Sequence, residues 1–142
     1  MTIRALLIAL SLWLVPAAQA GGALTPEDLA QIRAVINRQI DAFKRDDAPG
    51  AFALASPGVR EAFGTPERFL DVVRVSYRAV YRPAAMTFLG LTVIGQDAVQ
   101  QVQLTDGSGG VWHAYYAMQR QRDGSWRTNG CRLVQPSKTI PT

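Results

Sequence analysis

The sequence predicts an α+β domain in which three helices pack on a four-stranded antiparallel sheet. Apolar residues recur at helical spacing in the first half of the chain. The second half is rich in valine, threonine and aromatic residues, and short turn sequences interrupt it. Helices followed by strands, rather than alternating with them, are typical of this class.

The first element, residues 1–20, has the pattern of a cleavable secretory signal. Arg4 precedes an apolar run over residues 5–15, and a small-residue cleavage site ends at Ala20. A membrane anchor is the alternative, but a spanning helix needs about 20 apolar residues, and this run is shorter. We therefore expect residues 21–142 to form one mature domain in the periplasm or the medium, with no membrane attachment.

The composition of the mature chain excludes several kinds of partner. Without Arg4, 14 of the 15 basic residues remain against 11 acidic ones, a net charge of +3 with no block of like charges. This net charge is too small to indicate binding to nucleic acid or to a membrane surface. Cys131 is the only cysteine, so no internal disulfide can form.

Capping sequences mark the helices. The first begins after Thr25 and ends near residues 46–47, and its outer face is polar and includes Asp41. A short helix over residues 51–55 follows, and Ser56-Pro57-Gly58 is interpreted as the turn that closes it. Thr65 begins a third helix, which the proline at position 83 ends. The apolar stripes of the two long helices are Leu29, Ile32, Ile36, Ile40 and Phe43, then Phe69, Val72, Val73, Tyr77 and Val80.

Helical spacing also aligns Arg74, Arg78 and Arg82. Asp71 lies one turn before Arg74, at the distance that allows an ion pair. The row is therefore interpreted as a solvated, partly paired face and not as an anion site.

Strands are predicted over residues 86–94, 98–104, 111–119 and 126–134, joined by hairpin-length loops into an antiparallel meander. The last loop leaves two registers open. A two-residue turn would place Trp126 beside Gln119. A three-residue loop, with Gly124 in the left-handed conformation, places Trp126 on the face of Trp112, Tyr116 and Met118. We favour the second, because it gathers the large apolar groups. The outward residues are then His113, Tyr115 and Arg127.

Several motifs spread over nearly all of the mature chain carry a family resemblance. They are Asp41-Ala42-Phe43, Ala55-Ser56-Pro57, Phe63-Gly64-Thr65-Pro66-Glu67, Tyr81-Arg82-Pro83 and Asp123-Gly124-Ser125-Trp126. With them the chain resembles the bacterial domain-of-unknown-function family 4864, which is similar to the nuclear-transport-factor-2-like superfamily. The resemblance implies a cone: a strongly curved sheet wraps around a long helix, and the space inside forms a pocket. The superfamily includes isomerases, dehydratases, cyclases and binding modules, so the fold implies no single function.

Groups for acid–base catalysis are scarce. Enzymes of this fold class that transfer protons need a carboxylate or histidine inside the cone. In the strand half, Asp97, Asp106 and Asp123 fall in turns, where solvent should leave their pKa values ordinary. His113 faces outward, and Cys131 is interpreted as a small buried hydrophobe. No catalytic residue, metal site or cofactor is predicted, and the balance is against an enzyme.

Aromatic side chains are the remaining candidates for a site. The predicted ligand pocket consists of Tyr77, Tyr81, Trp112, Tyr116 and Trp126. Such rings either fill a core or form the walls of a pocket, and both alternatives stay open. Tyrosine hydroxyls can orient a ligand carbonyl without a base, which suits binding better than turnover.

Three functions follow. The favoured one is an exported, non-catalytic domain that binds a small apolar ligand in its cone. The second is a protein-interaction or homodimerisation module that uses the outer sheet face, with Tyr115, Ala117, Leu133 and Cys131 as its apolar residues. The third is an isomerase, cyclase or dehydratase that acts on a hydrophobic small molecule.

Overall fold

The computed structural model describes residues 24–136, and the predicted signal over residues 1–20 lies outside them. Helices come first and strands second, as the sequence predicts. In the described part of the chain, no helix is long and apolar enough to cross a membrane. The elements are α1 (Pro26–Lys44), α2 (Ala48–Ala53), α3 (Pro57–Phe63), α4 (Pro66–Ser76), α5 (Arg78–Tyr81), β1 (Ala85–Ile94), β2 (Asp97–Thr105), β3 (Val111–Arg120) and β4 (Trp126–Val134).

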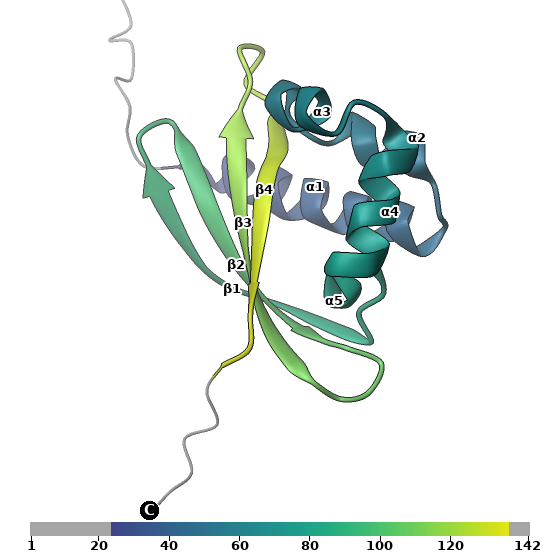
Figure 1. Cartoon of the computed structure of the whole chain (residues 1–142). Coiled ribbons are helices and arrows are strands. Elements are labelled where there is room, and N and C mark those ends of the chain that lie inside the picture. The colour runs from purple at the N-terminus through teal and green to yellow at the C-terminus, as the bar shows by residue number, and fades with distance from the viewer. Residues whose placement is uncertain (1–23, 137–142) are drawn as a thin grey trace, which may run out of the picture.

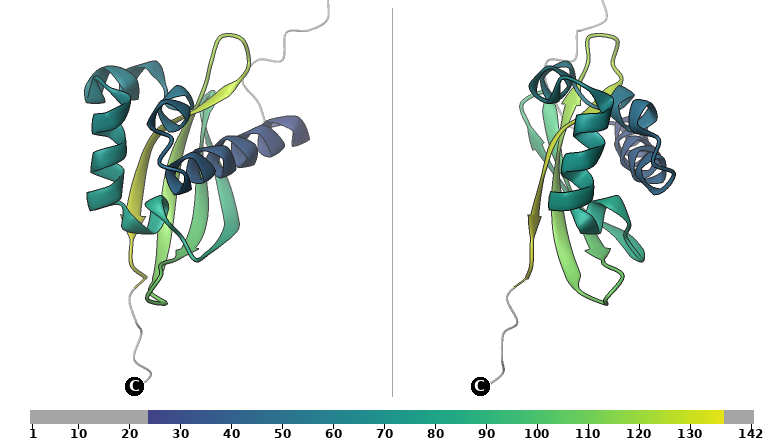
Figure 2. Two further views of the ribbon diagram at one scale, coloured as in Figure 1. Left: turned by 90° about the vertical axis from the view of Figure 1, so that its right-hand side faces the viewer. Right: turned by 45° about the vertical axis from the view of Figure 1, so that its right-hand side comes forward.

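The four strands form an antiparallel meander in the order β1-β2-β3-β4, which confirms the predicted topology. The long helix α1 runs across the strands, and α4 stands beside β4 (Figures 1 and 2). The stripe of α1 packs into the core, where Ile32, Ile36, Ile40 and Phe43 are at most 2% exposed. The predicted α+β class is therefore confirmed.

Three helices begin in the same way. The hydroxyls of Thr25, Ser56 and Thr65 each accept a hydrogen bond from a backbone N–H in the first turn, and a proline follows each of them. The interpretation of Ser56-Pro57-Gly58 as a closing turn was therefore wrong. Ser56 begins α3, which adds a helix that the sequence analysis did not expect.

The predicted third helix is broken at Tyr77. Its backbone angles there are φ −130° and ψ 52°, outside the helical region, so α4 ends at Ser76 and the short α5 begins at Arg78. The break places Ala79 and Val80 in the core, each 3% exposed, and leaves Val75 on the surface. Tyr77 therefore lies at a joint between two helices and not inside one.

The last hairpin has the favoured register. Gly124 has φ +85°, its N–H donates to the carbonyl of Gln121, and the N–H of Gln121 donates to the carbonyl of Ser125. This is a three-residue loop with a left-handed glycine. Trp126 and Thr128 consequently point into the core, 2% and 5% exposed.

A bulge inside β4 changes the face of the sheet on which the side chains after it lie. Thr128 pairs with Met118 and Gly130 with Ala117, so the chain bulges between them, and Gly130 has φ +143°. Cys131 then lies opposite the buried Tyr116, and Leu133 opposite the buried Ala114. Residues opposite each other in an antiparallel pair share a face. The expectation that Leu133 and Cys131 lie on the outer face was therefore wrong, because the bulge turns both inward.

Candidate ligand cavity

A cavity of about 430 Å³ lies between the helices and the two last strands. Helices α1, α3 and α4 contribute most of its wall, and β3 and β4 close it. Three phenylalanines on the helix side form an aromatic cluster, with the Phe69 ring centroid 5.2 Å from that of Phe63 and 5.7 Å from that of Phe43. The volume falls within the range of roughly 300–1,000 Å³ that is usual for small-molecule sites.

Tyr116 supplies the cavity with an unpaired polar group. The side chain is 2% exposed and lines the cavity, and its hydroxyl has no hydrogen-bond partner among the described residues. Burial raises the pKa of Tyr116 well above its ordinary value, and the neighbouring Cys131 adds to the effect. The hydroxyl therefore stays protonated, able both to donate and to accept a hydrogen bond.

The other buried polar side chains of the cavity wall have hydrogen-bond partners within the protein. The side-chain amide of Gln39 donates to the carbonyl of Ala51 and to the hydroxyl oxygen of Thr128, both at 3.0 Å. The hydroxyl of Thr128 donates in turn to the carbonyl of Leu54 at 3.3 Å. These bonds tie α1 to the chain around α2 and to β4. Of the described residues that line the cavity, Tyr116 alone has a buried side-chain polar atom without a partner.

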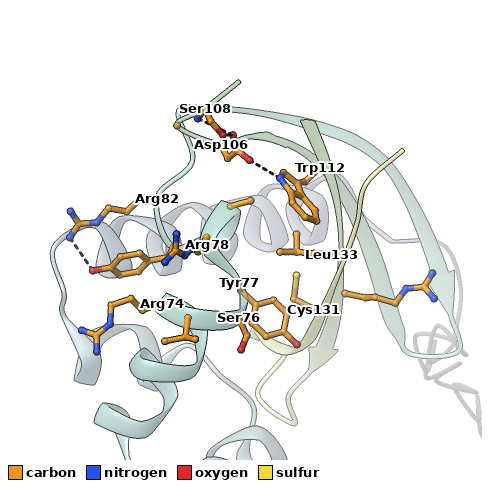
Figure 3. Close-up of a pocket in the computed structure, with 15 residues that line it drawn as sticks. Arg74, Ser76, Tyr77, Arg78, Arg82, Asp106, Ser108, Trp112, Cys131 and Leu133 are labelled. Atoms are coloured by element: carbon orange, nitrogen blue, oxygen red, sulfur yellow. Dashed lines mark hydrogen bonds between the residues drawn. The ribbon is translucent and has the colours of Figure 1, made fainter. Parts of the chain in front are cut away.

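A larger groove of about 990 Å³ lies between α4, α5, the end of β4 and the turn from β2 to β3. Figure 3 shows Arg74, Arg78 and Arg82 on its helix side, opposite Trp112, Leu133 and Cys131. The groove thus has a row of arginines on its helix side, and on its strand side apolar side chains together with Arg132.

The arginines of the groove differ in their partners. Arg74 pairs with Asp71 at 2.6 Å, as the sequence analysis predicted, and Arg82 pairs with Asp46 at 3.1 Å. The hydroxyl of Tyr81 also donates to Asp46, and this bond raises the pKa of Tyr81. In the part of the chain that the structure describes, Arg78 has no acidic partner within ion-pair distance.

The turn acid Asp106 closes one end of the groove. It accepts hydrogen bonds from the indole N–H of Trp112 at 2.9 Å, from Ser108 and from the backbone of Gly110. These donors, Trp112 first, lower its pKa to about 2. Hydrogen bonds from Ser125 lower the pKa of Asp123 as well. The expectation of ordinary pKa values for these two acids was therefore wrong, because Asp123 accepts bonds from Ser125 in its own turn and Asp106 accepts them from its turn and from Trp112 of β3.

Two side chains, Tyr77 and Cys131, line both the cavity and the groove. Figure 3 shows them next to each other at one end of the groove. Cys131 is half-buried, and burial raises the pKa of its thiol to about 12. The cavity and the groove are therefore adjacent spaces that share a wall.

Four of the five predicted pocket residues are divided between the two spaces. Tyr77 and Tyr116 line the cavity, and Tyr77, Tyr81 and Trp112 line the groove. Trp126 lines neither space. Its indole instead donates to Asp28 near the start of α1, at 3.1 Å, and its side chain is part of the buried core.

Asp28 is the buried acid that the sequence analysis missed. It is 7% exposed and accepts two hydrogen bonds from Arg120, both at 3.0 Å, besides those from Trp126 and from the N–H of Thr25. The bonds from Arg120, more than any other contact, hold its pKa well below the ordinary range. It lines neither the cavity nor the groove, so this carboxylate acts as a structural ion pair.

Metal ligands do not cluster in the described region. Over residues 24–136, no group of three or more histidine, cysteine, aspartate or glutamate side chains could hold a metal ion. His113 lies on the outer sheet face, with a ring nitrogen 3.3 Å from the side-chain amide of Gln101.

Comparison with known proteins gives a family match and one structural likeness. The family described as "Domain of unknown function (DUF4864)" matches residues 25–140. No curated protein matches the chain. The fold is similar to the crystal structure of an NTF-2-like protein of unknown function from Silicibacter pomeroyi DSS-3, with a TM-score of 0.54 and 19% identity, over 79% of this chain and 100% of that one. At this identity the likeness shows the fold alone, which is NTF-2-like.

Proposed function

The chain belongs to the DUF4864 family and has an NTF-2-like fold, and on this basis we propose that it is an exported, non-catalytic domain that binds a small apolar ligand in its cavity. The ligand carries one neutral oxygen, such as a carbonyl or hydroxyl, which bonds to Tyr116.

The unpaired hydroxyl of Tyr116 is the observation that carries this proposal. A buried polar group without a partner costs about 1–3 kcal/mol. Phenylalanine would fill the same space without that cost, so the hydroxyl weakens folding unless a ligand uses it. Around it the wall is mostly apolar, and each Å² of apolar surface that a ligand removes from water contributes roughly 25 cal/mol.

The ionisable side chains support binding over catalysis. Asp28 is bound by Arg120 and Trp126, away from both spaces, and its low pKa makes it a poor base. The thiol of Cys131 has a pKa of about 12, so little thiolate forms near neutral pH. His113 faces away from the cavity. These placements argue against an isomerase, cyclase or dehydratase.

Export is proposed from the sequence, because residues 1–20 have the order of a cleavable signal. The alternative of a dimer through the outer sheet face loses support in the structure. With Leu133 and Cys131 turned inward, only Tyr115 and Ala117 of the four expected residues stand on that face, and Tyr115 lies between Gln101 and Arg132.

The proposal is tested with two ring compounds of nearly equal shape, 1-tetralone and tetralin, of which only the first has a carbonyl. Calorimetry should show that the wild-type protein binds tetralone roughly three- to tenfold more tightly than tetralin, the worth of one hydrogen bond. Tyr116→Phe should remove this preference while still binding tetralin.

Tyr115→Phe is the matched control, because its hydroxyl lies on the outer face next to Gln101. It should keep the preference for tetralone. Equal affinity of the wild-type protein for the two compounds, or a preference that survives in Tyr116→Phe, would show that the hydroxyl does not bind the ligand.

A further inference from the structure

The cavity and the groove meet at Tyr77 and Cys131, which line both of them. These two side chains therefore stand between the two spaces, and a ligand that occupied both would have to pass them. The two spaces differ in character: the cavity wall is mostly apolar around Tyr116, whereas the groove has arginines along its helix side (Figure 3).

Arg78 is the arginine on the helix side of the groove whose charge is available. Arg132 of β4 also lines the groove, but its guanidinium lies over the ring of Tyr115 on the outer face, 5.5 Å from the ring centroid. Arg74 and Arg82 are each held by an aspartate, at 2.6 Å and 3.1 Å, but no acid of the described chain lies within ion-pair distance of Arg78. Asp106, an acid that also lines the groove, accepts its hydrogen bonds from Trp112, Ser108 and Gly110. Arg78 is exposed, so an anion can reach it from solvent without a large desolvation cost.

We infer that the two spaces form one bipartite site for an amphipathic anion, whose apolar body fills the cavity past Tyr77 and Cys131 and whose anionic group pairs with Arg78 in the groove. This inference rests on the proposed function, because it assumes that the cavity takes the apolar part. A carboxylate and a phosphate ester share the required chemistry, and a guanidinium binds either.

The test compares three probes with the same alkyl chain: decanol, decanoate and decyl phosphate. At low salt, calorimetry should give decanoate, decyl phosphate or both a roughly two- to fivefold higher affinity than decanol, as expected for an exposed ion pair. The anion that gains more identifies the headgroup. Arg78→Gln should remove the gain, and so should high salt, which screens exposed charges.

Arg68→Gln is the matched control, because Arg68 is an exposed arginine on the neighbouring helix α4 that lines neither space. It should leave the preference for the anions unchanged. Cys131 supplies a second readout: the anionic probe should slow its reaction with a thiol reagent, since the ligand passes beside it.

Two results would overturn the inference. One is a wild-type protein that binds decanol as tightly as both anions, or binds none of the three probes. The other is an anion preference that Arg78→Gln leaves intact. If tetralone still depends on Tyr116 in either case, the proposed function stands and only the bipartite site falls. If tetralone binding does not depend on Tyr116 either, both the proposed function and the bipartite site are refuted.

Discussion

Replacing Asp28 by asparagine tests how much the ion pair at the start of α1 stabilises the contact between this helix and the sheet. The carboxylate joins segments 92 residues apart through two bonds from Arg120, and it also accepts the indole N–H of Trp126. An amide in its place keeps one acceptor oxygen and removes the negative charge. Arg120 is then left without a counter-ion.

The expected cost follows from these contacts. Removing one member of a buried ion pair costs about 3–5 kcal/mol. The side chain of Arg120 remains 32% exposed, so solvent offsets part of the loss. We expect Asp28→Asn to lower the free energy of unfolding by about 2 kcal/mol, which corresponds to roughly 8 °C in Tm for a domain of this size.

Urea unfolding at neutral pH measures this difference. Asp41→Asn is the matched control, because Asp41 is an exposed acid on the same helix. It should change stability by less than about 0.5 kcal/mol. If the two variants were equally stable, the ion pair would contribute nothing and the account of Asp28 would be refuted.

The contribution of Asp28 to folding stability should decrease as the pH falls. The pKa of Asp28 is lower in the folded than in the unfolded protein, so its contribution is fully present above the ordinary aspartate value, about 3.9, and is lost as pH falls below it. The stability difference between wild type and Asp28→Asn should therefore shrink in acid. A constant difference down to the acid limit of folding would contradict this assignment.

Three further predictions concern other parts of the chain. Cys131, with a thiol pKa of about 12, should react with a thiol reagent roughly a hundredfold more slowly in the folded protein than in urea, and equal rates would show that it is exposed. Gly130→Ala should cost about 1–2 kcal/mol because of the positive φ of Gly130, whereas Gly107→Ala, with no positive φ, should change stability little; equal unfolding midpoints would remove the argument for the bulge. The intact mass of the exported protein should correspond to a chain that begins at Gly21, and a product that keeps Met1 would refute signal cleavage.

Local signals in the sequence were sufficient for most of the fold. The capping pair Thr25-Pro26, the alternation in the strands and the Asp123-Gly124 turn each act within a few residues, so they predict elements without knowledge of the rest of the chain. The same signal at Ser56-Pro57 begins α3. It was misinterpreted because Gly58 follows and made the segment resemble a turn.

Other features depend on contacts between distant segments. The partner of Asp28 is Arg120, and no spacing rule connects them. The cavity lies where α3 and α4 pack against β3 and β4, so it depends on contacts between distant segments and not on any motif. The bulge at Gly130 had one cue, a glycine inside a strand, and that cue would have placed Cys131 and Leu133 on the inner face.

The central claim is that the hydroxyl of Tyr116 binds a ligand oxygen inside the cavity. A crystal structure of the protein with 1-tetralone tests it most directly. The account predicts the rings of tetralone against Phe43 and Phe69, with the carbonyl oxygen at a distance of roughly 2.6–3.0 Å from the Tyr116 hydroxyl. A cavity closed by its own side chains, with the Tyr116 hydroxyl bonded to another protein group, would contradict it.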